Sequence, residues 1–142
     1  MFLRFLILVP VIALSGCSTA PLIVEATGGP NQAQVATAPR RQLSQPEQAF
    51  IQEQIASTLK DPSSAQFKHY PLVLWKLKNG GYVYCAQVNG KNSYGGYVGY
   101  SWSYNVIFPD SSGKITSVRP ISIDSGEMRT AADLCSAYGY VT

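Results

Sequence analysis

Residue types that could perform catalysis are few in this chain. His69 is the only histidine, and it stands beside Tyr70-Pro71, where a surface or strand-edge role is more common than that of a catalytic base. A Cys85/His69 nucleophile pair would leave Cys135 unexplained. The acidic residues show no paired spacing, and there is no Gly-x-Ser-x-Gly elbow, phosphate-binding glycine loop or Cys-x-x-Cys motif. We therefore expect a noncatalytic protein without a metal site or a cofactor.

The N-terminal segment has the features of a secretion signal. Arg4 precedes an apolar run over residues 5–14 that only Pro10 interrupts. The run is too short to cross a bilayer, which needs roughly 20 apolar residues. A positive start followed by about 7–15 apolar residues is typical of an exported protein. The run ends in Leu14-Ser15-Gly16-Cys17, where two small residues let the backbone enter a peptidase cleft.

This tetrapeptide resembles the lipobox of bacterial lipoproteins at every position. The resemblance implies that Cys17 receives a diacylglycerol thioether, that the chain is cleaved before it, and that the new amine is acylated. Several acyl chains, at about 0.8 kcal/mol per buried methylene, anchor a domain stably to a membrane. By the same resemblance, Ser18 points to the outer membrane, facing the periplasm. The alternative is an ordinary signal peptide with a chance cysteine.

Assigning Cys17 to lipid leaves Cys85 and Cys135, an even number in an oxidising compartment. We expect these two to form a disulfide, which would close a loop of about fifty residues and stabilise the fold by roughly 4 kcal/mol. Two buried free thiols, or a reactive Cys85 without a partner, remain the alternatives.

The most unusual stretch is Asn89 to Tyr104, NGKNSYGGYVGYSWSY. Tyr100, Trp102 and Tyr104 fall at period two, which places them on one face of a strand. Aromatic residues with polar tips favour binding surfaces, and loops carry sites more often than core. The candidate binding residues are Lys91, Asn92, Tyr94, Tyr97, Tyr100 and Trp102. The alternative is that the aromatic face is the core side of a sheet.

Residues 46–108 also carry a moderately specific resemblance, on Asp61-Pro62-Ser63-Ser64-Ala65-Gln66-Phe67, Cys85, Val88-Asn89-Gly90-Lys91-Asn92 and Gly95-Gly96-Tyr97-Val98-Gly99-Tyr100. They resemble a group of small exported bacterial proteins of unassigned function. The resemblance implies a defined domain and brings no activity with it.

The pattern predicts an α+β fold with an N-terminal helix, an antiparallel four-stranded meander and a short C-terminal helix. Ser44 and Glu47 form a capping box before a helix over residues 46–60, which Pro62 ends. The closing helix is expected with Met128, Ala131, Leu134 and Cys135 facing inward. It spans residues 126–135, and the strands are expected at 72–77, 82–88, 97–108 and 114–123.

The chain divides into a signal peptide (1–16), a lipidated flexible tether rich in Ala, Thr, Gly, Pro and Gln (17–43), and one small domain (44–142). The net charge of +3 comes from scattered residues, which excludes a nucleic-acid partner. Only 13% of residues are charged, while nine Tyr, five Phe and two Trp make the chain aromatic. This composition favours an exported, strand-rich domain.

We therefore expect a lipid-anchored envelope protein that binds another protein, as an accessory component of an envelope assembly. The alternative is a glycan- or peptidoglycan-binding module that uses residues 94–104. A domain that contributes only stability and has no ligand is a third hypothesis.

Overall fold

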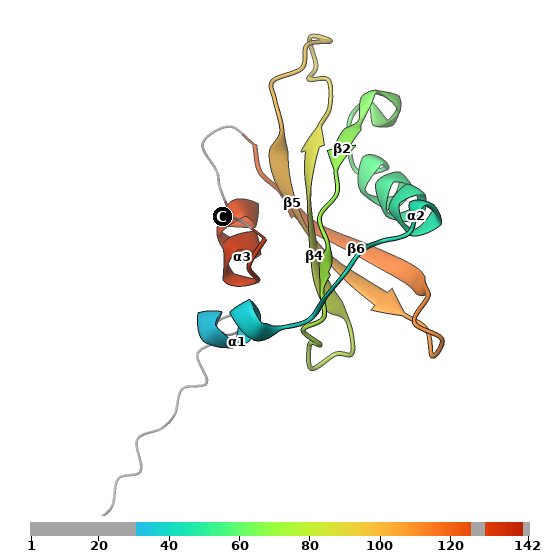
Figure 1. Cartoon of the computed structure of the whole chain (residues 1–142). Helices are drawn as coiled ribbons and strands as arrows, with labels where there is room; N and C mark the ends of the chain where they lie inside the picture. The colour runs from blue at the N-terminus through green and yellow to red at the C-terminus, as the bar shows by residue number, and fades with distance from the viewer. Residues whose placement is uncertain (1–30, 126–129, 141–142) are drawn as a thin grey trace, which may run out of the picture.

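Strands fill the middle of the chain, and helices lie on both sides of them (Figure 1). The computed structural model describes residues 31–125 and 130–140. The elements, in chain order, are α1 (Gln32–Thr37), β1 (Arg40–Arg41), α2 (Gln45–Ala56), the 3₁₀ turn η1 (Pro62–Ser64), β2 (Gln66–Lys68), β3 (Leu72–Val73), β4 (Tyr82–Asn89), β5 (Ser101–Pro109), β6 (Ile115–Ile123) and α3 (Thr130–Ala137). The predicted α+β class is confirmed.

The main sheet is antiparallel, with four strands in the order β2-β4-β5-β6. Its centre is the β4–β5 pair, in register from Tyr82 opposite Ile107 to Val88 opposite Ser101. Helix α2 covers one face of the sheet and α3 the other (Figure 1). Both faces of the sheet therefore belong to the core, and β4 has buried residues at both odd and even positions.

Three turns in the sheet region share one hydrogen-bond pattern, over residues 77–81, 92–96 and 110–114. In each, the first residue donates its N–H to the C=O of the fifth, at 2.8–2.9 Å. The fourth residue is a glycine that donates to the first carbonyl and has a positive φ, between 79° and 86°. This left-handed conformation favours glycine, because a side chain would be strained there.

The predicted strand over residues 72–77 pairs with the main sheet only at Lys76, which forms an isolated antiparallel bridge with Tyr82. Gln66–Lys68 pairs with β4 instead. After Pro71 the chain turns away, and Leu72–Val73 pairs with Arg40–Arg41 in a separate two-stranded sheet. No pattern in the sequence indicates β1, since its two arginines pair with residues more than thirty positions away and form no alternating apolar pattern.

Helix α2 begins as predicted and ends earlier. Ser44 and Glu47 form the expected capping box, and Ile51 and Ile55 are fully buried. The helix stops at Ala56 rather than residue 60, because Thr58 and Leu59 donate to carbonyls three residues back, which tightens the last turn. Glu47 also forms two 2.9 Å hydrogen bonds with the Arg41 guanidinium, which lower the pKa of the carboxyl to about 2.

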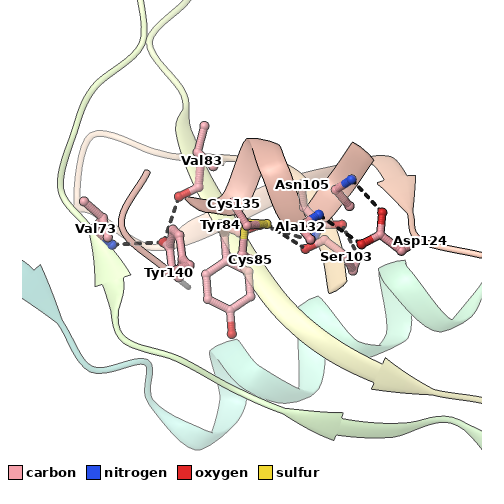
Figure 2. The surroundings of a disulfide bond; sticks show 11 residues. Val73, Val83, Tyr84, Cys85, Ser103, Asn105, Asp124, Ala132, Cys135 and Tyr140 are labelled. Atoms are coloured by element: carbon pink, nitrogen blue, oxygen red, sulfur yellow. Dashed lines mark hydrogen bonds between the residues drawn. A yellow bond between two sulfur atoms is a disulfide. The ribbon is translucent and has the colours of Figure 1, made fainter. Parts of the chain in front are cut away.

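Helix α3 is joined to the sheet by the predicted disulfide between Cys85 and Cys135, whose Cα atoms are 6.0 Å apart (Figure 2). Both cysteines are fully buried. The Asp124 carboxylate accepts the amides of Ala131 and Ala132 at the start of the helix, at 2.7 and 3.0 Å. Leu134 was expected to face inward, but it is 36% exposed. The predicted residues 126–129, including Met128, lie outside the described residues.

Residues 31–43 differ from the flexible tether that the sequence predicts. Val35 and Leu43 are buried, and Arg40 donates a 2.9 Å hydrogen bond to the Gly139 carbonyl. The buried Tyr140 hydroxyl donates to the Val83 carbonyl and accepts the Val73 amide, so the C-terminal end is fixed to the same region (Figure 2). The folded unit therefore includes residues from 31 onward. In the part of the chain that the structure describes, no helix is long and apolar enough to cross a membrane.

Removing the disulfide should weaken the fold strongly. The C85A/C135A variant frees a loop of fifty positions, and its free energy of unfolding should fall by about 4 kcal/mol from loop-closure entropy alone. Urea unfolding of the oxidised protein, the reduced protein and the variant measures this. A loss below about 1 kcal/mol in both altered forms would contradict the prediction.

The Glu47 carboxylate should stabilise the fold in a pH-dependent way. Its pKa is lowered from 4.5 to about 2 in the folded chain, chiefly by Arg41, so its contribution is present above pH 4.5 and is lost as the pH falls toward 2. Glu47→Ala should cost about 1 kcal/mol at pH 7. Glu47→Gln keeps a capping side chain without charge. The difference in unfolding temperature between Glu47→Gln and the original chain should shrink as the pH falls from 5 to 2. A difference that stays constant over this range would refute this account.

Candidate functional site

A hairpin that projects from the sheet carries most of the predicted binding residues. This tip hairpin, residues 90–100, joins β4 to β5 and extends past the ends of the neighbouring strands (Figure 1). Every residue from Lys91 to Tyr100 is exposed. The sequence stretch that looked most unusual is therefore a surface feature along most of its length.

Asn92 builds the turn at the end of the tip hairpin. Its side-chain oxygen accepts the backbone N–H groups of Tyr94 and Gly96, at 2.9 and 3.1 Å. Its own backbone bonds to Gly95 and Gly96 close the turn. The turn at Asp110 uses the same arrangement, with a carboxylate in place of the amide. Asn92 thus determines the shape of the tip, a role the sequence analysis did not assign to it.

Ser64 of η1 braces the base of the hairpin. Its hydroxyl accepts the Lys91 amide at 3.0 Å, and its carbonyl accepts the Tyr97 hydroxyl at 2.9 Å. Lys60 adds a third connection, with its ammonium 2.6 Å from the Ser93 hydroxyl. Ser64 is nearly buried by these contacts. Sequence analysis missed Ser64 and Lys60 as partners of the hairpin, since no periodic pattern relates them to it.

Two large side chains on the tip hairpin are almost free of contacts. Tyr94 is 97% exposed and Val98 is 76% exposed. The backbone that carries Tyr94 is nevertheless fixed, because its N–H group is bonded to Asn92. Tyr94 therefore presents an exposed aromatic ring to solvent from a turn that is fixed by hydrogen bonds.

A second aromatic surface lies on the α3 side of the sheet. Cys85 faces α3, and its register partner is Tyr104, while Trp102 is opposite Gln87 on the same face. Trp102 and Tyr104 therefore share one face, and Tyr70 joins them with its ring centroid 5.1 Å from that of Trp102. Tyr100 precedes β5, and it lies under the ammonium of Lys68, the register partner of Gln87. We call Tyr70, Tyr100, Trp102 and Tyr104 the aromatic strip.

Of the four residues in this strip, Tyr100, next to the hairpin, is the most exposed. Tyr104 packs against Tyr138, and burial raises its pKa to about 12. Trp102 is half-buried, and Tyr100 is 39% exposed with the Lys68 ammonium 4.1 Å from its ring centroid. The alternative that the aromatic face is core therefore describes Tyr104 best and Tyr100 least. Lys68 and Tyr70 were missed, although their alternation along the chain could have indicated a shared face.

The opposite face of β5 carries polar side chains that are nevertheless fully buried. Ser103 and Asn105 are fully enclosed, and the Ser103 hydroxyl donates to the Asn105 side chain at 3.2 Å. The Asn105 amide in turn donates to the Tyr84 carbonyl. These bonds satisfy the side-chain polar groups of Ser103 and Asn105.

A groove of about 330 Å³ runs beside the tip hairpin. One wall comes from the chain after α2 and another from the hairpin itself, while the end of β6 forms the third. The residues that matter for its chemistry are Leu59, Lys60, Lys91, Val98, Ile123 and Asp124. Its volume lies at the lower end of the range of small-ligand pockets, roughly 300–1,000 Å³.

His69 is placed as a structural residue. Its Nδ1 is 2.7 Å from the Tyr84 hydroxyl, its ring stacks near Phe67, and burial lowers its pKa. Cys85 is bonded to Cys135, so a Cys85/His69 nucleophile pair is not present. Among the described residues, no group of three or more His, Cys, Asp or Glu side chains could hold a metal ion.

Cys17, the expected lipidation site, lies outside the described residues. Comparisons of the chain with protein-family models, with curated proteins and with solved structures find no match.

The role of Asn92 in the turn predicts a local effect on hydrogen exchange. Asn92→Ala removes the acceptor for the Tyr94 and Gly96 amides, so their exchange should become about fivefold to tenfold faster, as loss of about 1 kcal/mol per hydrogen bond implies. NMR-detected exchange measures this. Asn92→Asp keeps the acceptor, so in that variant the Tyr94 and Gly96 amides should exchange slowly. The matched amides of Ser112 and Lys114 provide an internal reference. Equal rates in the Ala and Asp variants would show that the side chain does not hold the turn.

Proposed function

We propose that this chain is a noncatalytic, lipid-anchored protein of the bacterial cell envelope whose tip hairpin binds another protein. The observation that carries the proposal is Tyr94, 97% exposed on a turn that Asn92 closes and Ser64 braces. Aromatic side chains supply much of the binding energy at protein interfaces. A segment that is ordered before binding loses less entropy when the partner arrives. The noncatalytic part of the proposal rests on the sequence.

The position of the hairpin suits attachment through the N-terminal side. Helix α1, where the described chain begins, lies at the end of the molecule opposite the tip hairpin (Figure 1). A lipid on Cys17, which the lipobox-like sequence supports, would therefore leave Tyr94 directed away from the attachment point. This arrangement fits an accessory component that reaches a partner within an envelope assembly. Ser18 favours the outer membrane, facing the periplasm, as its location.

The aromatic strip supports a glycan- or peptidoglycan-binding module as the second candidate. Half-exposed rings at Trp102 and Tyr70 lie beside the Gln87 amide, which accepts the Tyr70 hydroxyl at 3.1 Å. Rings next to polar groups can stack on a sugar and bond to its hydroxyls. The strip is ranked second because neighbouring side chains already cover much of its surface, whereas Tyr94 is free.

Photo-crosslinking in cells tests the leading proposal. A photoreactive residue at position 94 of the full-length chain should form a protein adduct, identified by mass spectrometry. Position 112 is the matched control, because it occupies the same place in the equivalent turn at the other end of β5. Tyr94→Ser should weaken partner capture by about tenfold or more, with stability changed by less than about 0.5 kcal/mol.

Two results would contradict the leading proposal. One is equal adduct formation from positions 94 and 112, which would make the contact nonspecific. The other is a position-94 adduct that muramidase digestion releases as glycan fragments, which would favour the second candidate. In that case binding to purified peptidoglycan should depend on Trp102 and Tyr70 rather than on Tyr94.

A further inference from the structure

We propose that the groove beside the tip hairpin binds an acidic, apolar peptide segment of the partner protein that contacts Tyr94. This inference rests on the proposed function and names the chemistry that the partner must bring. It follows from the composition of the groove walls, from their charges and from their continuity with the hairpin.

The groove is lined by apolar and by cationic side chains. Leu59, Val98, Ile123 and the buried Val88 supply apolar lining, and Lys60 and Lys91 are the cationic groups. Val98 is 76% exposed, so covering it would remove apolar surface from water. A peptide with apolar side chains therefore gains more from this groove than a purely polar ligand would.

The charges that line the groove favour an anion. Lys60 and Lys91 both line it, and the only ion pair among the described residues is Arg41 with Glu47. Lys60 is held by the neutral Ser93 hydroxyl, and Lys91 acts on the exposed Asp61 carboxylate, whose pKa is lowered mainly by Ser63. Among the described residues, the Lys60 ammonium has a neutral hydroxyl rather than a carboxylate as its partner, so it could pair with a carboxylate in the groove.

In the described part of the chain, Asp124 is the acidic residue that lines the groove, and its carboxylate already has partners. Both oxygens of Asp124 accept backbone amides at the start of α3, from Ala131 and Ala132 (Figure 2). Its charge therefore interacts with the N-terminal end of that helix. Among the described residues that line the groove, two lysines therefore stand against one carboxylate, and this complements an Asp or Glu side chain in the occupant.

The groove is continuous with the proposed binding hairpin. Lys91 and Val98 belong to the two arms of the hairpin, and Ser93, which Lys60 contacts, is the neighbour of Tyr94. A partner seated on Tyr94 would therefore meet the Lys60 ammonium next. A partner segment with an acidic residue between apolar residues would bring its carboxylate to Lys60 and its apolar side chains to the apolar lining of the groove.

Crosslinking from the groove, compared with crosslinking from the tip, tests this inference on the full-length chain. Photoreactive residues at 94, 98 and 112 are introduced singly, and the partner residues in each adduct are mapped by mass spectrometry. The expected result is that 94 and 98 react with one protein, and that the segment mapped from 98 contains Asp or Glu among apolar residues. Position 112 should give no adduct with that protein.

The mapped segment, made as a peptide, then serves as the probe for affinity. The K60Q/K91Q variant should bind it about tenfold more weakly, and a peptide with Asn or Gln in place of its acidic residues should show the same loss. Lys114→Gln, at the equivalent turn, is the control and should bind normally. Binding to the original chain should weaken as salt is raised from 50 to 300 mM.

The outcomes separate the two proposals. Adducts from 94 without any from 98, a mapped segment without a carboxylate, or unchanged affinity of K60Q/K91Q would overturn the groove proposal and leave the hairpin function standing. No adduct from either 94 or 98 would overturn both. A glycan adduct from 98 would also refute the peptide as occupant.

Discussion

The pairing of β4 with β5 decides where almost every other group in this domain lies. Its register sends Cys85 and Tyr104 to the side of α3, and Tyr84 and Asn105 to the side of α2. Side chains alternate along a strand, so a slip of one residue would exchange the two faces. The cysteine would then face α2, the enclosed Asn105 would lose its bonds, and the aromatic strip would be divided. The disulfide and the Ser103–Asn105 bonds both depend on this register.

Local signals in the sequence predicted local structure well. The capping box joins Ser44 to Glu47 within one helical turn, so the interactions that form it are contained in a short window of sequence. The disulfide was also predictable, because only two cysteines remained to pair. The β1–β3 ladder was not, since Arg40 and Arg41 pair with distant residues and carry no strand pattern.

The candidate site shows the same difference between local features, which the sequence predicts, and contacts between distant residues, which it does not. Period two in Tyr100, Trp102 and Tyr104 indicated a shared face, and the strand pairing gives one to Trp102 and Tyr104. The sequence grouped Asn92 and Tyr97 with the binding residues, but their hydrogen bonds shape and brace the hairpin. Tyr70, Ser64 and Lys60 meet the site only through the tertiary fold. Predicting them required knowing that η1 and the end of α2 lie beside the hairpin.

The docking of residues 31–43 determines how a mechanical load on the N-terminal side would enter the domain. Force arriving at Asn31 first meets α1, the Arg40–Gly139 hydrogen bond and a two-residue ladder. The long β4–β5 ladder and the disulfide lie beyond these weaker contacts. Residues 31–43 would therefore detach from the domain before the main sheet unfolds, and this would add up to ~45 Å of extension. The tip hairpin would keep its shape throughout, because none of its supports lies on that path.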